Sequence, residues 1–227
     1  AVTGSQTQYG WRSERRIFTS ESTVVAEYVH DPSQADAYQS ESALEKEMIR
    51  LLEGQAYDYL PITSEAELVA NLRVQLEKVN RMTFSDAEWA QFFTTKVAGA
   101  NDGIVEKTVR VQEDHVQILR RDDGTTKNIA LIDKTNIHNN RLQVINQYEI
   151  ARGEGDAVEG GSRYANRYDV TVLVNGLPMV HIELKRRGVD IREAFNQINR
   201  YQRESFWSGS GLFEYVQLFV EGVSLAV

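Results

Sequence analysis

The sequence predicts a mixed α/β fold in which helices precede a meander of strands. Three observations predict it. Apolar residues recur at helical spacing in three segments of the first half, and each segment opens on a Ser-x-x-Glu pattern. From about residue 115 the pattern changes to two-residue alternation and β-branched runs, which are typical of strands. The last third reads as strand, helix and strand, a unit that is expected to be parallel and right-handed.

Three helices are predicted at about residues 42–54, 64–80 and 85–98. In a capping box, a serine hydroxyl and the carboxylate three residues later satisfy free backbone N–H groups at the start of a helix. Residues 1–38 are polar, and we expect them to form an irregular lead-in. The capping-box pattern occurs at Ser42-Ala-Leu-Glu45, Ser64-Glu-Ala-Glu67 and Ser85-Asp-Ala-Glu88.

The strands are predicted from residue 115 onward. HVQILRR and KNIALID flank Asp122-Asp123-Gly124 and predict a hairpin, and RLQVINQYEI predicts a further strand. RYDVTVLV and MVHIELK flank Asn175-Gly176, a strong signal for a second hairpin. Asp190-Ile-Arg-Glu193 opens a helix, and the apolar run YVQLFV, residues 215–220, predicts a strand buried on both faces.

The composition excludes several kinds of site. The chain has no cysteine, so thiolate catalysis and cysteine-based metal sites are excluded, and a reducing cytoplasm is the expected location. No window approaches the roughly 18 apolar residues of a membrane span. The net charge of −8 argues against nucleic acid, but residues 163–203 carry eight Lys or Arg against four Asp or Glu, a local charge of +4. That stretch is either a solvated face or a basic footprint.

One predicted strand carries charges where a buried strand is expected. Residues two apart on a strand share a face, so one face carries Met179, His181, Glu183 and Lys185. A second carboxylate, Asp169, lies at the start of the preceding strand. Two carboxylates and a lysine that converge at a hairpin can hold a hard divalent cation and contact a phosphate. The alternative is a structural salt bridge between Lys185 and either acid.

The register of this hairpin decides whether Asp169 meets Glu183. A two-residue turn at Asn175-Gly176 with regular pairing places Asp169 opposite Ile182 and turns Glu183 to the other face. An odd loop, or a bulge that adds one residue, brings Asp169 opposite Glu183. Because Pro178 cannot donate a backbone hydrogen bond, we predict an odd connection or a bulge.

The spacing D-x13-E-x-K, formed by Asp169, Glu183 and Lys185, resembles the PD-(D/E)xK nuclease core. Gln197 and Tyr201 match the Gln-x-x-x-Tyr motif of the RecB-like branch of these nucleases. Glu45 sits where that branch often has a glutamate, with Glu41 and Glu47 as alternatives.

Longer phrases resemble the N-terminal nuclease domain of the R (restriction, HsdR-type) subunit of type I restriction-modification enzymes. The resemblance spans roughly residues 38–220. The matching phrases are YQSESALEKEMIRLL, NRYDVTVLVNGLPMVHIELKRRG, REAFNQINRYQRESF and YVQLFV.

The resemblance implies a role for each matched residue. Asp169 and Glu183 would hold Mg²⁺ with the backbone carbonyl of Leu184, and Lys185 would orient the attacking water or stabilise the charge on the phosphate. Gln197, Tyr201 and Glu45 would support the site, and the alternative for each is an ordinary helix position. Five arginines would contact DNA phosphates or serve surface solubility: Arg186, Arg187, Arg192, Arg200 and Arg203.

The implied fold is a PD-(D/E)xK restriction-endonuclease-like core, a mixed central sheet flanked by helices, with an N-terminal helical elaboration. We therefore expect a lead-in at 1–38, an endonuclease domain at 39–221 and a tail at 222–227. Within the domain, core elements are expected at 42–54 and 115–220, and a helical insertion at 64–98.

The implied function is that of a type I site-specific deoxyribonuclease that cleaves double-stranded DNA with Mg²⁺ after ATP-driven translocation by the full subunit. No Walker A sequence is present, so the helicase motor is absent from this chain. ATP, S-adenosylmethionine and the methylation (M) and specificity (S) subunits are therefore expected only at the level of the full complex. The alternative is a catalytically silent DNA-docking or subunit-contact module, and a Holliday-junction resolvase with the same core is a third candidate.

Overall fold

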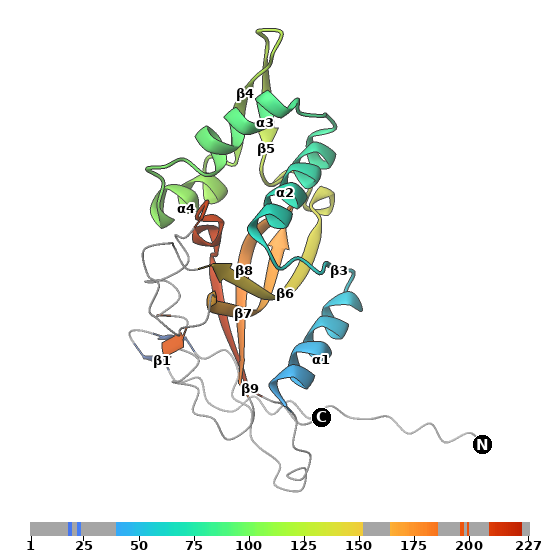
Figure 1. The fold of residues 1–227 in the computed structure, drawn as a ribbon, viewed down its shortest axis with the longest axis vertical. Coiled ribbons are helices and arrows are strands. Elements are labelled where there is room, and N and C mark those ends of the chain that lie inside the picture. The colour runs from blue at the N-terminus through green and yellow to red at the C-terminus, as the bar shows by residue number, and fades with distance from the viewer. Residues whose placement is uncertain are drawn as a thin grey trace, which may run out of the picture. The chain divides into compact units, whose positions relative to one another are not determined.

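The computed structural model describes residues 40–151, 164–185 and 209–223, together with Phe18–Thr19, Ser22–Thr23 and positions 196, 197 and 199. The chain divides into two compact units, residues 1–37 with 226–227, and residues 38–225. In the first unit, β1 (Phe18–Thr19) pairs with β2 (Ser22–Thr23) in antiparallel orientation. The second unit holds the helices and the central sheet (Figure 1).

Five strands form the central sheet. They are β3 (Asp58–Tyr59), β6 (Leu142–Ala151), β7 (Tyr164–Val174), β8 (Leu177–Lys185) and β9 (Leu218–Val223). Their order in space is β3-β6-β7-β8-β9. The two inner pairs, β6 with β7 and β7 with β8, are antiparallel, whereas β3 with β6 and β8 with β9 are parallel. The predicted mixed α/β fold is confirmed.

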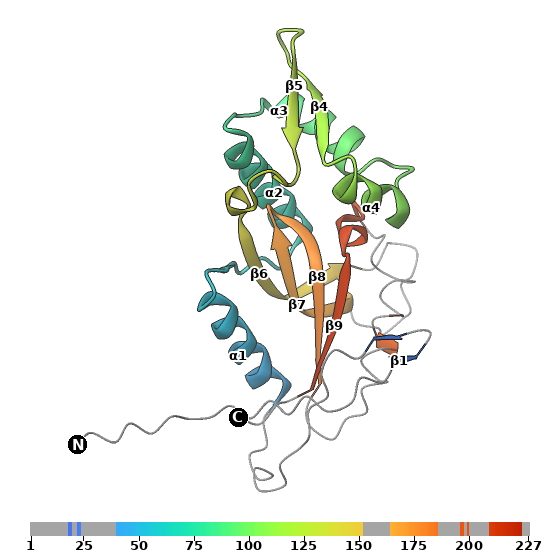
Figure 2. The same ribbon diagram turned by 180° about the vertical axis from the view of Figure 1, so that it is seen from behind.

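Four α-helices accompany the sheet in the part of the chain that the structure describes (Figure 2). They are α1 (Glu41–Glu53), α2 (Glu65–Asn80), α3 (Asp86–Phe92) and α4 (Ile104–Gln112). The three predicted helices are confirmed, and the third continues beyond α3 as a π-helical turn, Phe93–Val97. Helix α4 was not predicted, because Val105 and Val109 face solvent and blur its apolar stripe. None of the described helices is long and apolar enough to cross a lipid bilayer.

The start of α1 corrects one prediction. Ser40, not Ser42, caps this helix, since the Oγ of Ser40 accepts a hydrogen bond from the N–H of Ala43 at 3.2 Å. Glu45, the predicted capping partner of Ser42, instead turns toward the sheet and is 7% exposed. Glu45 is therefore available for contacts with the strands.

Apolar residues gather in two clusters. One lies between α1 and the sheet and contains Ile49 of α1 with valine, isoleucine and leucine side chains of β6, β7 and β8. The other joins α2, α3 and α4 to further residues of the same strands. Two packed layers of this kind hold a sheet rigidly, so its strands can present polar side chains at fixed positions.

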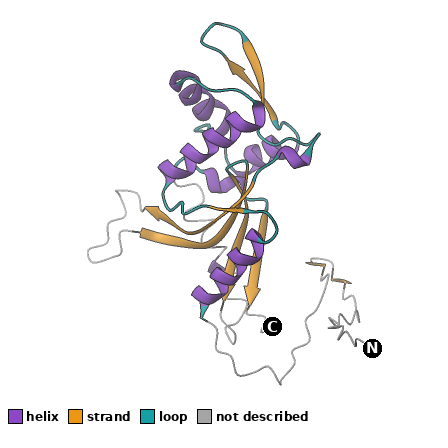
Figure 3. Ribbon diagram, turned by 90° about the vertical axis from the view of Figure 1, so that its right-hand side faces the viewer, coloured by secondary structure: helices purple, strands orange, loops and turns teal. Residues whose placement is uncertain are grey.

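The hairpin of β4 (Val116–Arg120) and β5 (Thr126–Ala130) is present as predicted. It forms a two-stranded sheet of its own and is not a continuation of the central sheet. Figure 3 shows this hairpin beyond the helices, away from the central sheet. The hairpin therefore elaborates the helical part of the unit.

The segment that leads into β9 differs from the prediction. The strand begins at Leu218, whereas Tyr215 and Val216 are buried at the end of a 3-10 turn, η4 (Leu212–Tyr215). Leu218 is 55% exposed, so burial of residues 215–220 as a strand on both faces was wrong. The parallel pairing of β9 with β8 is confirmed. Most of the helix predicted from Asp190 lies outside the described residues.

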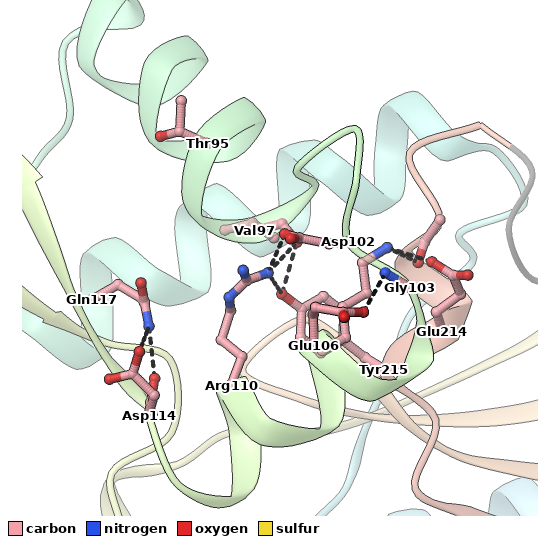
Figure 4. Close-up of polar contacts among 12 residues, drawn as sticks. Thr95, Val97, Asp102, Gly103, Glu106, Arg110, Asp114, Gln117, Glu214 and Tyr215 are labelled. Atoms are coloured by element: carbon pink, nitrogen blue, oxygen red, sulfur yellow. Dashed lines mark hydrogen bonds and ion pairs between the residues drawn. The ribbon is translucent and has the colours of Figure 1, made fainter.

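Polar contacts fasten η4 to α4 and to the π-helical turn (Figure 4). The hydroxyl of Tyr215 donates to the carbonyl oxygen of Val97 at 2.7 Å, and Nη1 of Arg110 lies 2.7 Å from Oδ2 of Asp102. Arg110 also reaches the Tyr215 hydroxyl at 3.3 Å. These contacts fix the segment from which β9 enters the sheet.

Candidate active site

The β7–β8 hairpin contains the bulge that the sequence predicts. Val174 pairs with Leu177 across a two-residue turn, Asn175-Gly176, whose φ angles of 52° and 84° are typical of a tight hairpin. Between that turn and the Val172–Val180 pair the register shifts by one residue, which leaves Met179 without a paired residue on β7.

The shifted register sets the positions of the two acids. Val170 pairs with Ile182, and the same register places Asp169 opposite Glu183. The bulge prediction is confirmed, and the plain pairing that would have separated the two carboxylates is absent from the described hairpin.

Asp169 sits at the point where the two strands end their regular pairing. Its Oδ2 accepts a hydrogen bond from the backbone N–H of Leu184 at 2.9 Å. Burial and the charge of Glu183 raise the pKa of Asp169 to about 7, although the Leu184 hydrogen bond favours the ionised form. A positive charge placed between the two acids would remove this mutual repulsion.

Glu183 is fully buried and is held from two sides. Nζ of Lys185 donates to its Oε1 at 2.8 Å, and Nε2 of His181 lies 3.5 Å from its Oε2. Burial opposes ionisation of Glu183, but the contacts with His181 and Lys185 outweigh burial and hold its pKa below the usual value. Glu183 is therefore an ionised carboxylate in a dry position.

Lys185, the last residue of β8, also contacts a residue beyond that strand, Gln197. Its Nζ donates to Oε1 of Gln197 at 2.8 Å. Burial disfavours its charge, yet the hydrogen bond to Glu183 and the charges of Glu183 and Asp169 prevail and raise the pKa of Lys185. The ammonium is thus charged and oriented by two oxygen acceptors.

His181 lies on the same strand and is fully buried. Its ring meets Tyr168 edge-on with 5.1 Å between centroids, and Phe219 of β9 lies 6.4 Å away on a similar tilt. These aromatic neighbours fix the ring plane while its Nε2 faces Glu183.

Glu45 of α1 contacts strand β6, which pairs with the strand that carries Asp169. Its Oε2 accepts hydrogen bonds from Nε2 of Gln147 at 2.6 Å and from Nδ2 of Asn146 at 3.3 Å. The charge of Glu45 contributes to the raised pKa of Asp169, which places the two carboxyl groups in the same neighbourhood.

The two other candidate glutamates of α1 lie differently. Glu47 forms an exposed ion pair with Arg50, with 2.6 Å between Oε1 and Nη2. Glu41 is exposed at the first turn, where its charge contributes to the raised pKa of Lys185. Of the three, Glu45 is the one that is buried against the sheet.

The structure thus brings together Asp169, Glu183, Lys185, Gln197 and Glu45. Tyr201 and the five arginines predicted to contact DNA lie outside the described residues: Arg186, Arg187, Arg192, Arg200 and Arg203. Sequence reasoning missed Asn146 and Gln147, whose one signal is a pair of consecutive amides in an otherwise alternating strand.

The donor chemistry fits a hard divalent cation. Among the described residues no cluster of three or more His, Cys, Asp or Glu side chains is arranged around a common point, so side chains alone do not form a closed cage. Mg²⁺ is usually bound by one or two carboxylates, with water and substrate oxygens completing the octahedron. Asp169 and Glu183 offer such a pair, and their mutual repulsion favours a cation between them.

Comparison with known proteins points to one family. Residues 38–222 match the family model described as type I restriction enzyme R protein N terminus. The chain is 47% identical over 198 residues to the type I restriction enzyme EcoprrI endonuclease subunit of Escherichia coli, which covers 87% of this chain and 60% of that protein.

Two staphylococcal proteins are also similar. The chain is 39% identical over 188 residues to the SsaAORF53P endonuclease subunit of Staphylococcus saprophyticus and 37% identical over 189 residues to the SauMSSORF170P endonuclease subunit of Staphylococcus aureus strain MSSA476. In both comparisons the match covers 81% of this chain and 18% of the relative. The chain thus spans only part of the length of these relatives. Because the family model covers most of the chain, as the resemblance predicted, this chain belongs to the family of type I restriction enzyme R protein N termini.

Proposed function

We propose that this chain is the Mg²⁺-dependent endonuclease domain of a type I restriction enzyme R subunit, built on a PD-(D/E)xK core and acting on double-stranded DNA. The observation that carries the proposal is the bulge at Met179, which sets Asp169 opposite Glu183 and leaves Lys185 bonded to Glu183. We assign the domain to residues 39–221. The endonuclease names of its relatives support the same function.

The residues of the chain divide the work of phosphodiester hydrolysis. Asp169, Glu183 and the Leu184 carbonyl would hold Mg²⁺, which supplies polarisation of the scissile phosphate and acidification of the attacking water. Lys185 places a fixed positive charge beside these acids, where negative charge builds up on the phosphate during in-line attack. Gln197 keeps the Lys185 ammonium in position through its Oε1.

The rest of the reaction belongs to the larger assembly. The chain spans 60% of one relative and 18% of two others, and it contains no Walker A sequence. We therefore propose that ATP-driven translocation, S-adenosylmethionine and sequence recognition reside in other parts of the R subunit and in the M and S subunits. Arg186, Arg187, Arg192, Arg200 and Arg203 would supply sequence-independent affinity for DNA phosphates.

Nicking of supercoiled DNA in the presence of Mg²⁺ tests the proposal. Asp169→Ala, Glu183→Ala and Lys185→Ala are each expected to lower the rate about a hundredfold or more. The first two remove a carboxylate that would bind the cation, and the third removes the positive charge beside the reacting phosphate. Asp123→Ala is the matched control, since Asp123 is a carboxylate in the exposed turn between β4 and β5. Equal activity in all the variants would exclude this site.

The same variants distinguish a nuclease from a catalytically silent DNA-docking module. A chain that binds DNA and binds Mn²⁺ through Asp169 and Glu183, yet nicks no DNA, would favour a silent docking module over a nuclease. A chain that cuts DNA without any divalent cation would contradict the proposed chemistry.

A further inference from the structure

Gln147 has an unusual backbone for its place in the fold. Its φ is 53°, a left-handed conformation that is strained for a residue with a Cβ atom. Three other non-glycine residues with positive φ are described, Ala56, Arg81 and Asn175, and they lie in turns or at a helix end. Gln147 is the one inside a strand, which calls for a local explanation.

The side chains of Asn146 and Gln147, which are consecutive in the strand, point toward the same carboxylate. In a regular strand, consecutive side chains turn to opposite faces of the sheet. Here the amides of Asn146 and Gln147 both donate to the same atom, Oε2 of Glu45, at 3.3 and 2.6 Å. The left-handed turn at Gln147 interrupts the alternation and lets both amides reach one carboxylate.

The orientation of Asn146 is fixed as well. The hydroxyl of Tyr59 on β3 donates to Oδ1 of Asn146 at 3.0 Å, which leaves the Nδ2 group of the amide to face Glu45. Tyr59, Asn146 and Gln147 therefore form a polar clamp on Glu45, and the clamp draws on β3, β6 and α1.

The clamp lies next to Asp169 in the central sheet. Asn146 pairs with Val170 and Tyr148 pairs with Tyr168, so Gln147 lies opposite Asp169 across the β6–β7 pair. The strained residue is thus adjacent to a residue to which we assign a cation, and its hydrogen bond holds a third carboxylate nearby.

We propose that Gln147 is a positioning residue of the nuclease site, whose left-handed backbone turns two amides onto Glu45 and so holds that carboxylate beside Asp169. The inference rests on the proposed function and deepens it. Strain of this kind persists when the surroundings impose it, and functional sites are where it collects. Gln147 touches neither the cation nor the DNA and acts through Glu45.

Cation affinity and thermal stability together test this role. Mn²⁺, a paramagnetic substitute for Mg²⁺, is titrated into the 227-residue chain while electron paramagnetic resonance counts the free ion. Glycine adopts a positive φ without strain, so Gln147→Gly is expected to keep or raise the Tm. The same variant loses the amide that holds Glu45 and should bind Mn²⁺ about tenfold more weakly, as is typical when a residue that supports a metal site from outside its ligands is changed.

Arg81→Gly is the matched control, because Arg81 also has a positive φ, of 49°, at the end of α2. It should change the Tm in the same direction as Gln147→Gly and leave Mn²⁺ affinity unchanged. Glu45→Ala should weaken Mn²⁺ binding, and adding Gln147→Gly to it should weaken binding no further, because Glu45→Ala already removes the oxygen that accepts from Gln147.

Each outcome decides the question. Gln147→Gly that binds Mn²⁺ like the wild type, or losses that multiply in the double variant, would overturn the positioning role. A large drop in Tm for Gln147→Gly would assign the residue to the fold instead. Asp169→Ala serves as the reference: if it binds Mn²⁺ as the wild type does, or if the wild type binds none, the proposed function fails and takes this inference with it.

Discussion

Asp169 and Glu183 lie opposite each other, and the two residues differ in protonation. The pKa of Asp169 is raised to about 7 by burial and by the charge of Glu183, whereas Glu183 stays ionised beside Lys185. From about pH 4 to pH 7 the folded chain therefore keeps a proton on Asp169 that the unfolded chain has released. Stability from this proton is fully present below pH 4 and is lost as the pH rises through 7.

Replacement of Asp169 by asparagine removes this dependence on pH. We expect Asp169→Asn to gain stability relative to the wild type as the pH rises from 4 to 8, by on the order of 3 kcal/mol. The reason is that only the wild type must ionise a buried carboxyl group beside Glu183. Urea unfolding at several pH values, without divalent cations, measures the difference.

A matched control is Asp123→Asn in an exposed turn. Hydrogen bonds from Thr125 lower the pKa of Asp123, so its substitution should show no gain with rising pH. A difference between Asp169→Asn and the wild type that stays constant from pH 4 to 8 would contradict the raised pKa.

For individual residues, the sequence predicts the site where the spacing between residues determines which side chains share a face. The positions of Asp169, Glu183 and Lys185 were predictable because two-residue alternation and a one-residue bulge were enough to bring them together. Asn146 and Gln147 were not predictable as partners of Glu45. Their convergence depends on a left-handed φ at Gln147, and glutamine has no preference for that conformation.

Among the elements, the β7–β8 hairpin sets the geometry of the site. Its tight turn favours one strand register, whereas packing of the valine, isoleucine and leucine residues against α1 requires a register shifted by one residue. Met179, which has no paired residue on β7, accommodates both. A single residue thus absorbs the mismatch, while the pairs beyond it remain regular.

Two deletions of different length test the role of the bulge. Deleting Met179 alone removes the unpaired residue and leaves Asp169 opposite Glu183, so Mn²⁺ binding should stay within a few-fold of the wild type. Deleting Met179 and Val180 together moves the register by one residue and should weaken binding about tenfold or more. Mn²⁺ titration of both variants measures this, and equal losses would contradict the assigned register.

Two glycines in hairpin turns have similar backbone conformations but differ in how closely other residues pack against them. Gly124 and Gly176 both have positive φ, of 83° and 84°, but a Cβ at Gly124 meets nothing within 4 Å. A Cβ at Gly176 would approach the Cα of Leu72 to 2.6 Å, because α2 lies directly against that turn.

Gly124→Ala should therefore lower the free energy of unfolding by about 1 kcal/mol, and Gly176→Ala by about 3 kcal/mol or more. Chemical denaturation of the two variants provides the comparison. Losses of equal size would show that α2 moves away from the turn at little cost and that Gly176 is not tightly packed against Leu72.

The elements were predictable to different degrees for physical reasons. Capping boxes and regular apolar spacing predicted α2 and α3, since both signals are local in the chain. The start of β9 was not predictable, because the apolar side chains of Tyr215 and Val216 are buried by η4 and α4 and not by strand pairing. A continuous apolar run reports burial but does not say in which conformation.

The whole unit is tied together by contacts between residues far apart in the chain. Lys107 of α4 is 1% exposed, and its Nζ donates to Oε2 of Glu214 and to the carbonyl oxygen of Gly211, both at 2.7 Å. This contact joins the helical part of the unit to the segment that continues into β9. Asn175 works in a similar way, since its Nδ2 donates to the carbonyl oxygen of Leu131 at 3.0 Å.

Removal of the buried cation should destabilise the entire unit. Lys107→Met leaves the part-buried carboxylate of Glu214 without its partner, and we expect a loss of about 3–5 kcal/mol. Adding Glu214→Gln should recover part of that loss, because the neutral amide is less costly to bury. Urea unfolding curves of both variants give the values, and a loss below about 1 kcal/mol in Lys107→Met would contradict a dry ion pair.

The order of strands in the sheet has a consequence for synthesis. Strand β8 carries Glu183 and Lys185, and its parallel partner β9 is the last strand of the sheet to leave the ribosome. Until Leu218 and its successors emerge, β8 is an open edge with unpaired backbone groups, and such edges are prone to wrong pairing. The nascent chain thus carries an incomplete candidate site until β9 is made, so this site is among the last parts of the described sheet to mature.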